Sequence, residues 1–274
     1  LVACVKTPYT WLYYNWEPNH KIRSWIYNPS RYSEQFYDEN HLKLVSGEGD
    51  VDIEGQKVRI YGSPMGLYEN GRPKAGYLPI EELKTLRKLG SRLQGHPATA
   101  EGLPGIRIAS GSLGQGLSAA IGTALGKKLN NDPNFVYVLL GDGETQEGQV
   151  WEAAMFAAKY KTDNLIATID YNGRQIDGNV NDIMPLGDLS AKWNAFGWEV
   201  IELNKGNDIV EVVKTLKLAK EKGGKGKPVM ILMKTEMGNG VDFMMGTNKW
   251  HGIPPNDDEL KSGLSQLEET LGDY

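Results

Sequence analysis

Short apolar runs alternate with helical patterns along the second half of the chain. Strand-length runs cover residues 135–140, 164–170, 198–203 and 228–234. The first is continuously apolar and the second is apolar over most of its length, which is typical of strands buried on both faces of a sheet. Helical patterns lie between the runs, at residues 148–160, 189–196 and 209–222. This alternation predicts an α/β fold, a doubly wound and mostly parallel sheet with helices on both faces.

The part before residue 135 is less regular. An Ala- and Gly-rich helix is predicted at residues 117–129, and a short helix opens at Pro79 and stops at Gly90. Between residues 42 and 74 only QKVRIYG alternates like a strand, and residues 1–37 have no clear period. We therefore expect one domain over residues 1–274, with an irregular part over 1–74 and a regular part over 75–274.

Composition and charge exclude several classes of function. The chain has 30 basic and 35 acidic residues and a net charge of −5, so neither a nucleic acid nor an anionic membrane is an expected partner. Its single cysteine, Cys4, excludes an intrachain disulfide framework. The sequence contains neither a long apolar run nor a charged and apolar leader, so we expect no membrane span and a cytoplasmic location.

Two predicted strands end in oxygen-bearing side chains. Asp142 follows the strand at 135–140, and Asn172 follows the strand at 164–170. Parallel strands joined by one crossover bring both residues to the carboxyl edge of the sheet, where such folds bind ligands. A carboxylate, an amide oxygen and a carbonyl from the next loop suit Mg²⁺. Gly-Asp-Gly and Asn-Gly are also favoured turn sequences, so either one alone indicates only a turn.

Taken together, these stretches resemble a known family. GDGETQEGQVWEAAMFAAKYKTDNLIATIDYNG is similar to the thiamine diphosphate signature, in which Asn follows Gly-Asp-Gly at this spacing. Residues 75–274 resemble, more closely, the diphosphate-binding half of transketolase. The matching stretches, in family order, are GYLPIEELKTLRKLGSRLQGHP, SGSLGQGLSAAIGTALGKKL, GDGETQEGQVWEAA, NGRQIDG and KWHGIPPN.

The resemblance implies a thiamine diphosphate site with a divalent metal. Asp142 and Asn172 would bind Mg²⁺ through their side chains and Arg174 through its carbonyl, with Ca²⁺ or Mn²⁺ as substitutes. The family usually has an aliphatic residue at position 174, a departure that matters little if only the backbone binds. Gly143 and His251 would contact the diphosphate.

Other matching residues would face the cofactor rings or the sugar. Gly111 and Leu113 would line the site of the aminopyrimidine and the thiazolium. His96 matches a histidine that faces the reacting sugar, and an imidazole on a rigid Gly-His-Pro turn suits proton transfer near neutral pH. Glu147 matches an acid at the subunit boundary that links two active sites. His96, His251 and Glu147 are thus the catalytic candidates, although each alone is also an ordinary loop or helix-start residue.

The amino-terminal third departs from the family. Its usual Ser-Gly-His-Pro-Gly-Gly and Ser-Lys-Gly-His stretches are absent, and Gly62-Ser63 stands where the second Gly-His is expected. His20 and His41 have neighbours that match nothing, so two family histidines are unassigned. Three explanations are open: a divergent segment, a catalytically weakened relative, or an error in the sequence of residues 1–74. The abrupt change of composition favours the last.

The implied reaction moves a two-carbon glycolaldehyde unit from a ketose phosphate to an aldose phosphate. The glutamate that activates the aminopyrimidine belongs to a pyrimidine domain that follows in transketolase, and this chain reaches Tyr274 without it. We therefore expect either a fragment or a split enzyme. In the split form a C-terminal transketolase subunit carries the pyrimidine domain, in an α2β2 assembly with active sites at its interfaces. The ending resembles the carboxyl terminus of split forms.

Two other functions are open. One is the α subunit of a related thiamine-dependent dehydrogenase or synthase, which GDGETQEGQVWEAA and KWHGIPPN disfavour because they resemble transketolase more. The other is a noncatalytic protein that binds Mg²⁺ and diphosphate, which the missing histidines would suit.

Overall fold

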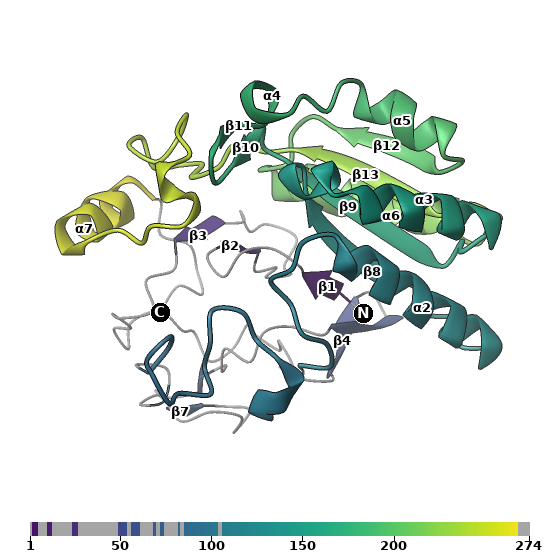
Figure 1. Cartoon of the computed structure of the whole chain (residues 1–274), viewed down its shortest axis with the longest axis horizontal. Coiled ribbons are helices and arrows are strands. Elements are labelled where there is room, and N and C mark those ends of the chain that lie inside the picture. Colours follow the sequence, from purple (N-terminus) through teal and green to yellow (C-terminus); the bar gives the residue numbers. More distant parts are fainter. Residues whose placement is uncertain are drawn as a thin grey trace. The chain divides into compact units, whose positions relative to one another are not determined.

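The computed structural model describes Glu82, residues 85–103 and residues 106–267, together with the backbone of seven short strands between residues 2 and 73. The chain divides into two compact units (Figure 1). Residues 1–6 and 112–253 form one, here called the sheet unit, and residues 7–111 and 254–274 form the second unit. The predicted division at residue 74 stays a prediction.

A five-stranded parallel sheet forms the centre of the sheet unit. In spatial order its strands are β1 (Val2–Cys4), β8 (Val136–Gly141), β9 (Leu165–Tyr171), β13 (Val229–Lys234) and β12 (Glu199–Leu203). Every pairing within it is parallel. The predicted α/β fold is confirmed, and each of the four predicted strands lies within one residue of its observed bounds.

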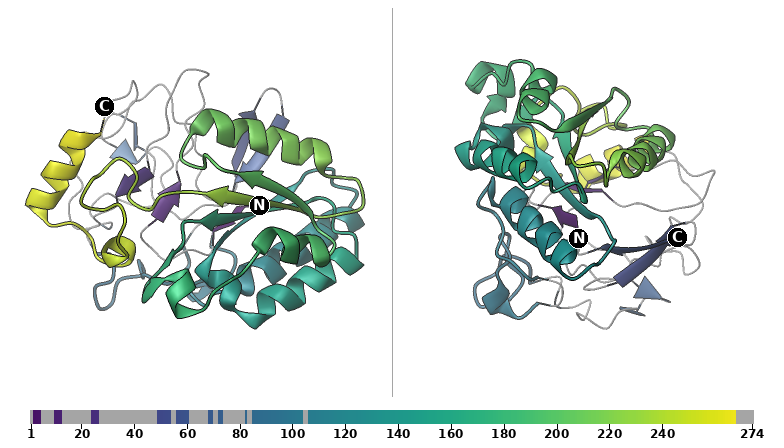
Figure 2. Two further views of the ribbon diagram at one scale, coloured as in Figure 1. Left: turned by 90° about the horizontal axis from the view of Figure 1, so that it is seen from above. Right: turned by 90° about the vertical axis from the view of Figure 1, so that its right-hand side faces the viewer.

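Helices cover both faces of this sheet. They are α2 (Gln115–Leu129), α3 (Gly148–Lys159), α5 (Leu189–Ala195) and α6 (Ile209–Lys222). Buried side chains of α2, α3 and α5 share one core with alternate strand residues such as Met230 and Leu232. The connection from β12 back to β13 reverses direction, so a right-handed crossover puts α6 on the other face (Figure 2).

Smaller elements lie at the ends of the strands. The short helix η2 (Gly143–Gln146) joins β8 to α3. The hairpin of β10 (Arg174–Gln175) and β11 (Gly178–Asn179), then α4 (Val180–Ile183), follow β9, and η3 (Lys249–His251) comes after β13. Among the residues that the structure describes, no helix is long and apolar enough to cross a membrane.

Asp163 ties several segments together at the amino edge of the sheet. It precedes β9, its carboxylate pairs with Lys128 at the end of α2, and it accepts a hydrogen bond of 2.8 Å from the Gly226 amide before β13. Burial alone would raise the pKa of Asp163, but the hydrogen bonds from Lys128 and Gly226 outweigh it and hold the pKa below its usual value. The charged form therefore stabilises this edge.

In the described residues, the second unit has three antiparallel strand pairs and one regular helix. The pairs are β2 (Thr10–Leu12) with β3 (Ser24–Ile26), β4 (Gly49–Ile53) with β5 (Gln56–Ile60), and β6 (Tyr68–Glu69) with β7 (Arg72–Pro73). The short helix η1 spans Thr99–Glu101, and α7 spans Asp257–Gln266 behind an Asn256 cap.

Eight of the described strands were not anticipated, β1 and β4 among them. The predicted QKVRIYG strand is confirmed as β5, but its partner β4 reads as a glycine-punctuated loop in the sequence. Likewise β1 extends the main sheet with only three residues. The three residues of β1 give no period to detect, and the glycines around β4 hide the alternation of its Asp, Val and Ile residues.

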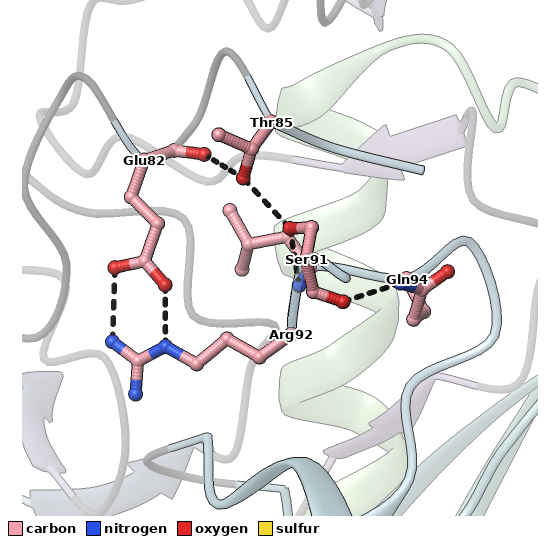
Figure 3. Close-up of polar contacts among 6 residues, drawn as sticks. Glu82, Thr85, Ser91, Arg92 and Gln94 are labelled. Carbon is pink, nitrogen blue, oxygen red and sulfur yellow. Dashed lines mark hydrogen bonds and ion pairs between the residues drawn. The ribbon is translucent and has the colours of Figure 1, made fainter. Parts of the chain in front are cut away.

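The helix predicted from Pro79 to Gly90 is wrong over residues 85–90, which form turns. Arg87 has a φ of +63°, and its amide donates to the carbonyl of Leu93 at 2.8 Å, a contact that no helix allows. The Thr85 hydroxyl lies 2.7 Å from that of Ser91, and Glu82 forms an ion pair with Arg92 (Figure 3). Local polar side chains thus compete successfully with the helix.

Tyr137 gives a prediction about alkaline stability. It alternates with the core residues Val136 and Val138 of β8, and burial raises the pKa of its hydroxyl to about 12. The folded chain then holds this proton more tightly than the unfolded chain, whose tyrosines titrate near about 10. The contribution is complete below that value and is lost as the pH rises through about 12.

We expect Tyr137→Phe to reduce the loss of stability across this alkaline window. The measurement is the free energy of urea unfolding at a series of pH values. Tyr160→Phe, at an exposed position, is the matched control and should leave the loss unchanged. Equal alkaline loss in wild type and Tyr137→Phe would contradict the prediction.

Candidate functional site

The carboxyl edge of the sheet brings three chain segments together. The register pairs Gly141 with Asp170 across β8 and β9, and Asp170 with Met233 across β9 and β13. The residues that follow these three strands therefore begin at the same edge of the sheet. Asp142, Asn172 and Thr235 come from these three segments, as expected for a ligand site in a doubly wound sheet.

Asp142 joins the ends of two strands. Its side chain is 1% exposed, and its Oδ1 accepts a hydrogen bond of 2.7 Å from the Gly143 amide. Its Oδ2 accepts from the amide of Gly173, the residue directly after Asn172. The carboxylate and the loop of Asn172 therefore meet, as the sequence spacing predicts. The metal-binding role itself stays a prediction.

Asn172 is oriented by its neighbours. Its amide nitrogen donates to Oδ2 of Asp170 at 3.1 Å, and its Oδ1 accepts from the Arg174 amide at 2.8 Å. Asp170, which is 7% exposed, also accepts a hydrogen bond from the Thr235 hydroxyl. This chain of contacts links β13 to β9 and fixes which face of the Asn172 amide carries the oxygen.

The β10–β11 hairpin lies directly beside the Gly-Asp-Gly turn. A Cβ added at Gly143 would lie 3.1 Å from Cβ of Gln175, so this close approach favours glycine. The Arg174 guanidinium turns along the hairpin and donates to Oδ1 of Asn179 at 2.5 Å. The unusual side chain at position 174 thus has a partner of its own, whereas the predicted ligand is its carbonyl.

The segment that carries His251 contacts the same hairpin. The Asn248 side chain donates to the Ile176 carbonyl at 3.0 Å, and His251 is the last residue of η3. Trp250 is held by a hydrogen bond of 2.9 Å to the Phe243 carbonyl, with the Lys249 ammonium 4.2 Å from its ring centre. The half-buried His251 therefore follows a segment anchored to the loop after Asn172.

The start of α2 is bound to the segment after β8. The amide of Gly114 donates to Oε1 of Glu144 at 2.8 Å, and the Leu113 carbonyl accepts from the side chain of Gln149 at 2.9 Å. Glu147 caps α3 by its backbone position, and its exposed side chain makes no capping hydrogen bond. The sheet unit thus brings Leu113 to the Gly-Asp-Gly segment.

Gly111 and His96 meet within the second unit. Gly111 has a φ of +112°, and a Cβ added there would lie 2.3 Å from Cδ2 of the His96 ring. The amide of Ser110 donates to the Pro97 carbonyl at 3.0 Å, which holds the two loops side by side. The predicted site residues Gly111 and His96 are therefore neighbours, and the His96 ring leaves room only for glycine at position 111.

The candidate metal donors are all oxygens. They comprise one carboxylate, one amide oxygen and one backbone carbonyl, from Asp142, Asn172 and Arg174. No group of three or more His, Cys, Asp or Glu side chains among the described residues could hold a metal, and the candidate set is of a different kind. It fits a hard cation that keeps positions for phosphate and water.

A comparison with protein families decides the identity. The sequence model described as "Transketolase, thiamine diphosphate binding domain" matches residues 67–271. The chain belongs to the transketolase family. This confirms the resemblance found in the sequence, and it disfavours a dehydrogenase or synthase subunit.

Relatives of two kinds share this transketolase region. The chain is 43% identical over 194 residues to "6-deoxy-6-sulfo-D-fructose transketolase subunit SqwG" of a Clostridium species, covering 71% of this chain and 69% of the relative. It is 39% identical over 226 residues to one of the subunits of the apulose-4-phosphate transketolase of Actinobacillus succinogenes, covering 82% and 78%. The solved transketolase of Campylobacter jejuni matches with a TM-score of 0.63 at 35% identity, over 70% of this chain and 30% of its own.

Some residues of the candidate site were missed in the sequence, and others lie outside the described residues. Sequence reasoning did not select Glu144, Gln149, Asp170 or Thr235, although Glu144 and Gln149 stand within a quoted motif. Their hydrogen-bond partners come from distant segments, so only the fold reveals them. The segments around His20, His41 and Gly62-Ser63, where the two family histidines were sought, lie outside the described residues.

Proposed function

We propose that this chain is the diphosphate-binding subunit of a two-subunit transketolase. The enzyme moves a two-carbon glycolaldehyde unit from a ketose phosphate to an aldose phosphate. One observation carries the proposal: the Asp142 carboxylate bonds to the amide next to Asn172, at the carboxyl edge of adjacent parallel strands. A divalent cation needs such a convergence of oxygen donors, and glycines beside it let a diphosphate approach the backbone.

Each site residue has a distinct task in this proposal. Asp142, Asn172 and the Arg174 carbonyl hold Mg²⁺, and Gly143 lets the diphosphate approach the backbone. His251, on the segment anchored to the β10–β11 hairpin, binds the diphosphate. When bound, thiamine diphosphate supplies a nucleophilic carbon and an electron sink for breaking the carbon–carbon bond of the sugar.

The remaining residues act on the rings and the sugar. Leu113 and Gly111 line the site of the cofactor rings. His96, on its exposed turn against Gly111, moves a proton at the sugar during bond cleavage. Glu147 lies at the boundary with the next subunit, where its exposed side chain is open to a partner.

A second subunit completes the site in this proposal. Two relatives are named as transketolase subunits, and this chain covers 69% and 78% of their lengths. It covers only 30% of the single-chain Campylobacter jejuni transketolase. We therefore propose a partner that carries the pyrimidine domain, in an assembly with two copies of each chain.

The first test is cofactor binding by the full chain. Calorimetric titration with thiamine diphosphate should give saturable binding in MgCl₂, and EDTA should abolish it because the diphosphate is held through the metal. Titration with thiamine, which has no diphosphate, is the matched control and should give no comparable binding. Binding that ignores both the metal and the diphosphate would contradict the proposal.

The second test separates an enzyme from a binding protein. The chain, the partner and their mixture are assayed for ketol transfer with apulose 4-phosphate, 6-deoxy-6-sulfofructose and fructose 6-phosphate as donors. Only the mixture should be active. Efficient transfer by this chain alone would refute the division of the enzyme into two chains, and metal-dependent binding without transfer by any mixture would favour the noncatalytic alternative.

A further inference from the structure

The peptide bond between Leu113 and Gly114 is held from both sides by side chains of one short segment. Its carbonyl oxygen accepts a hydrogen bond from Nε2 of Gln149 at 2.9 Å, and its amide donates to Oε1 of Glu144 at 2.8 Å. Glu144 lies in η2 and Gln149 in the first turn of α3. Both polar groups of this single peptide are therefore fixed by residues that flank the subunit-boundary candidate Glu147.

The Glu144 carboxylate also reaches the end of β8. Its second oxygen, Oε2, accepts a hydrogen bond of 3.1 Å from the amide of Gly141, the residue before Asp142. Glu144 is 2% exposed, and a buried carboxylate is costly unless donors surround it. Here two backbone donors face its two oxygens, an arrangement that produces strong charge-assisted hydrogen bonds.

An amide side chain could not replace this carboxylate. Glutamine has one acceptor oxygen and one donor nitrogen, so either Gly114 or Gly141 would face a donor instead of an acceptor. The bridge therefore needs glutamate rather than glutamine at position 144.

The backbone at Gly114, beside the Glu144 and Gln149 contacts, is closely packed. Gly114 has a φ of +82°, and a Cβ added there would lie 2.8 Å from Cγ of Gln149 and 3.0 Å from Cβ of Glu147. The start of α2 thus lies directly on the segment after β8, with glycine where the two segments meet.

We propose that Glu144 and Gln149 are positioning residues that set the Leu113–Gly114 peptide in register with Asp142. The bridge would couple the two halves of the cofactor site, the loop facing the rings and the turn holding the metal. This inference rests on the proposed function, in which Leu113 lines the cofactor rings. Neither residue need touch the cofactor itself.

The first experiment needs no cofactor. Hydrogen–deuterium exchange of the full chain is measured in wild type, Glu144→Gln and Gln149→Leu, with Glu152→Gln at an exposed position of α3 as the matched control. Exchange at the amide of Gly114 should become about tenfold faster or more in the first two variants, because that peptide is released locally. Unchanged exchange in both would overturn the bridge.

The second experiment measures thiamine diphosphate affinity in saturating MgCl₂. Glu144→Gln should raise the Kd about tenfold or more, since a lost hydrogen bond to a charged group has an effect of this size. Gln149→Leu removes a neutral hydrogen bond and should raise the Kd about fivefold. The double variant should lose less than the product of the single effects, because both release the same peptide. A merely structural role would lower the melting temperature and leave the Kd measured well below it unchanged, which would overturn the inference.

The outcomes distinguish this inference from the proposed function. Wild type that binds the cofactor, with bridge variants that bind equally well, would overturn the inference and leave the function standing. Wild type that binds no thiamine diphosphate would contradict the proposed function and the coupling with it. If Glu144→Gln fails to fold, Gln149→Leu, which removes one neutral hydrogen bond at a half-buried position, decides the question.

Discussion

Asp142→Asn is expected to weaken thiamine diphosphate binding in MgCl₂ by about a hundredfold or more. The substitution removes the only charged side chain among the proposed metal ligands, and hard cations depend on charged oxygen donors. In wild type the amides of Gly143 and Gly173 both donate to this carboxylate, and in the variant the asparagine NH₂ group would face one of these two donors. Calorimetric titration of the full chain measures the effect.

The matched control for this substitution is Asp258→Asn, at an exposed position of α7. It removes the same charge and should leave the Kd unchanged. Raising the Mg²⁺ concentration should partly restore binding to Asp142→Asn, because the defect lies in metal affinity. Cofactor binding of wild-type strength by Asp142→Asn would remove the central support of the proposed site.

Gly111→Ala should lower the kcat for ketol transfer about a hundredfold in the reconstituted enzyme, the usual effect of a displacement near 1 Å in a catalytic group. The added methyl group would lie 2.3 Å from the His96 ring, and the φ of +112° already disfavours alanine. The ring must therefore move. Steady-state kinetics measure the effect, and circular dichroism checks that the variant is folded.

Gly122→Ala is the control for an added methyl group, because nothing lies within 4 Å of that position in α2. It should keep full activity and slightly raise stability, since alanine favours a helix. In a His96→Ala background the clash at Gly111 disappears, so the second substitution should cost little further activity. A full hundredfold loss on top of His96→Ala would mean that Gly111 acts by another route.

The order of strands and helices in the sheet unit could be predicted from the sequence because the inner strands are rich in apolar residues. Runs such as 135–140 and 164–170 have few other uses in a folded chain, and the short crossovers between them leave little choice of topology. The same logic placed Asp142 and Asn172 on one edge. Their convergence follows from strand order alone, without any knowledge of side-chain contacts.

The parts that could not be predicted depend on single backbone groups. No pattern indicates that Arg87 takes a left-handed conformation, yet that residue ends the expected helix. Glu144 reads as a polar residue of a surface turn, whereas it is buried because amides of Gly114 and Gly141 need acceptors. Backbone amides that lack an acceptor of this kind can be recognised only in the folded structure, where distant segments lie together.

The contacts of Asp163 with Lys128 and Gly226 lie at the opposite edge of the sheet from Asp142 and Asn172. The contacts that hold the strands together and the candidate site thus lie at different ends of the same strands. Loops that follow the strands at the carboxyl edge can therefore differ in sequence without breaking the Asp163 contacts at the other edge. A sheet of this kind can take new loops at one edge while the contacts at its other edge keep the strands in register.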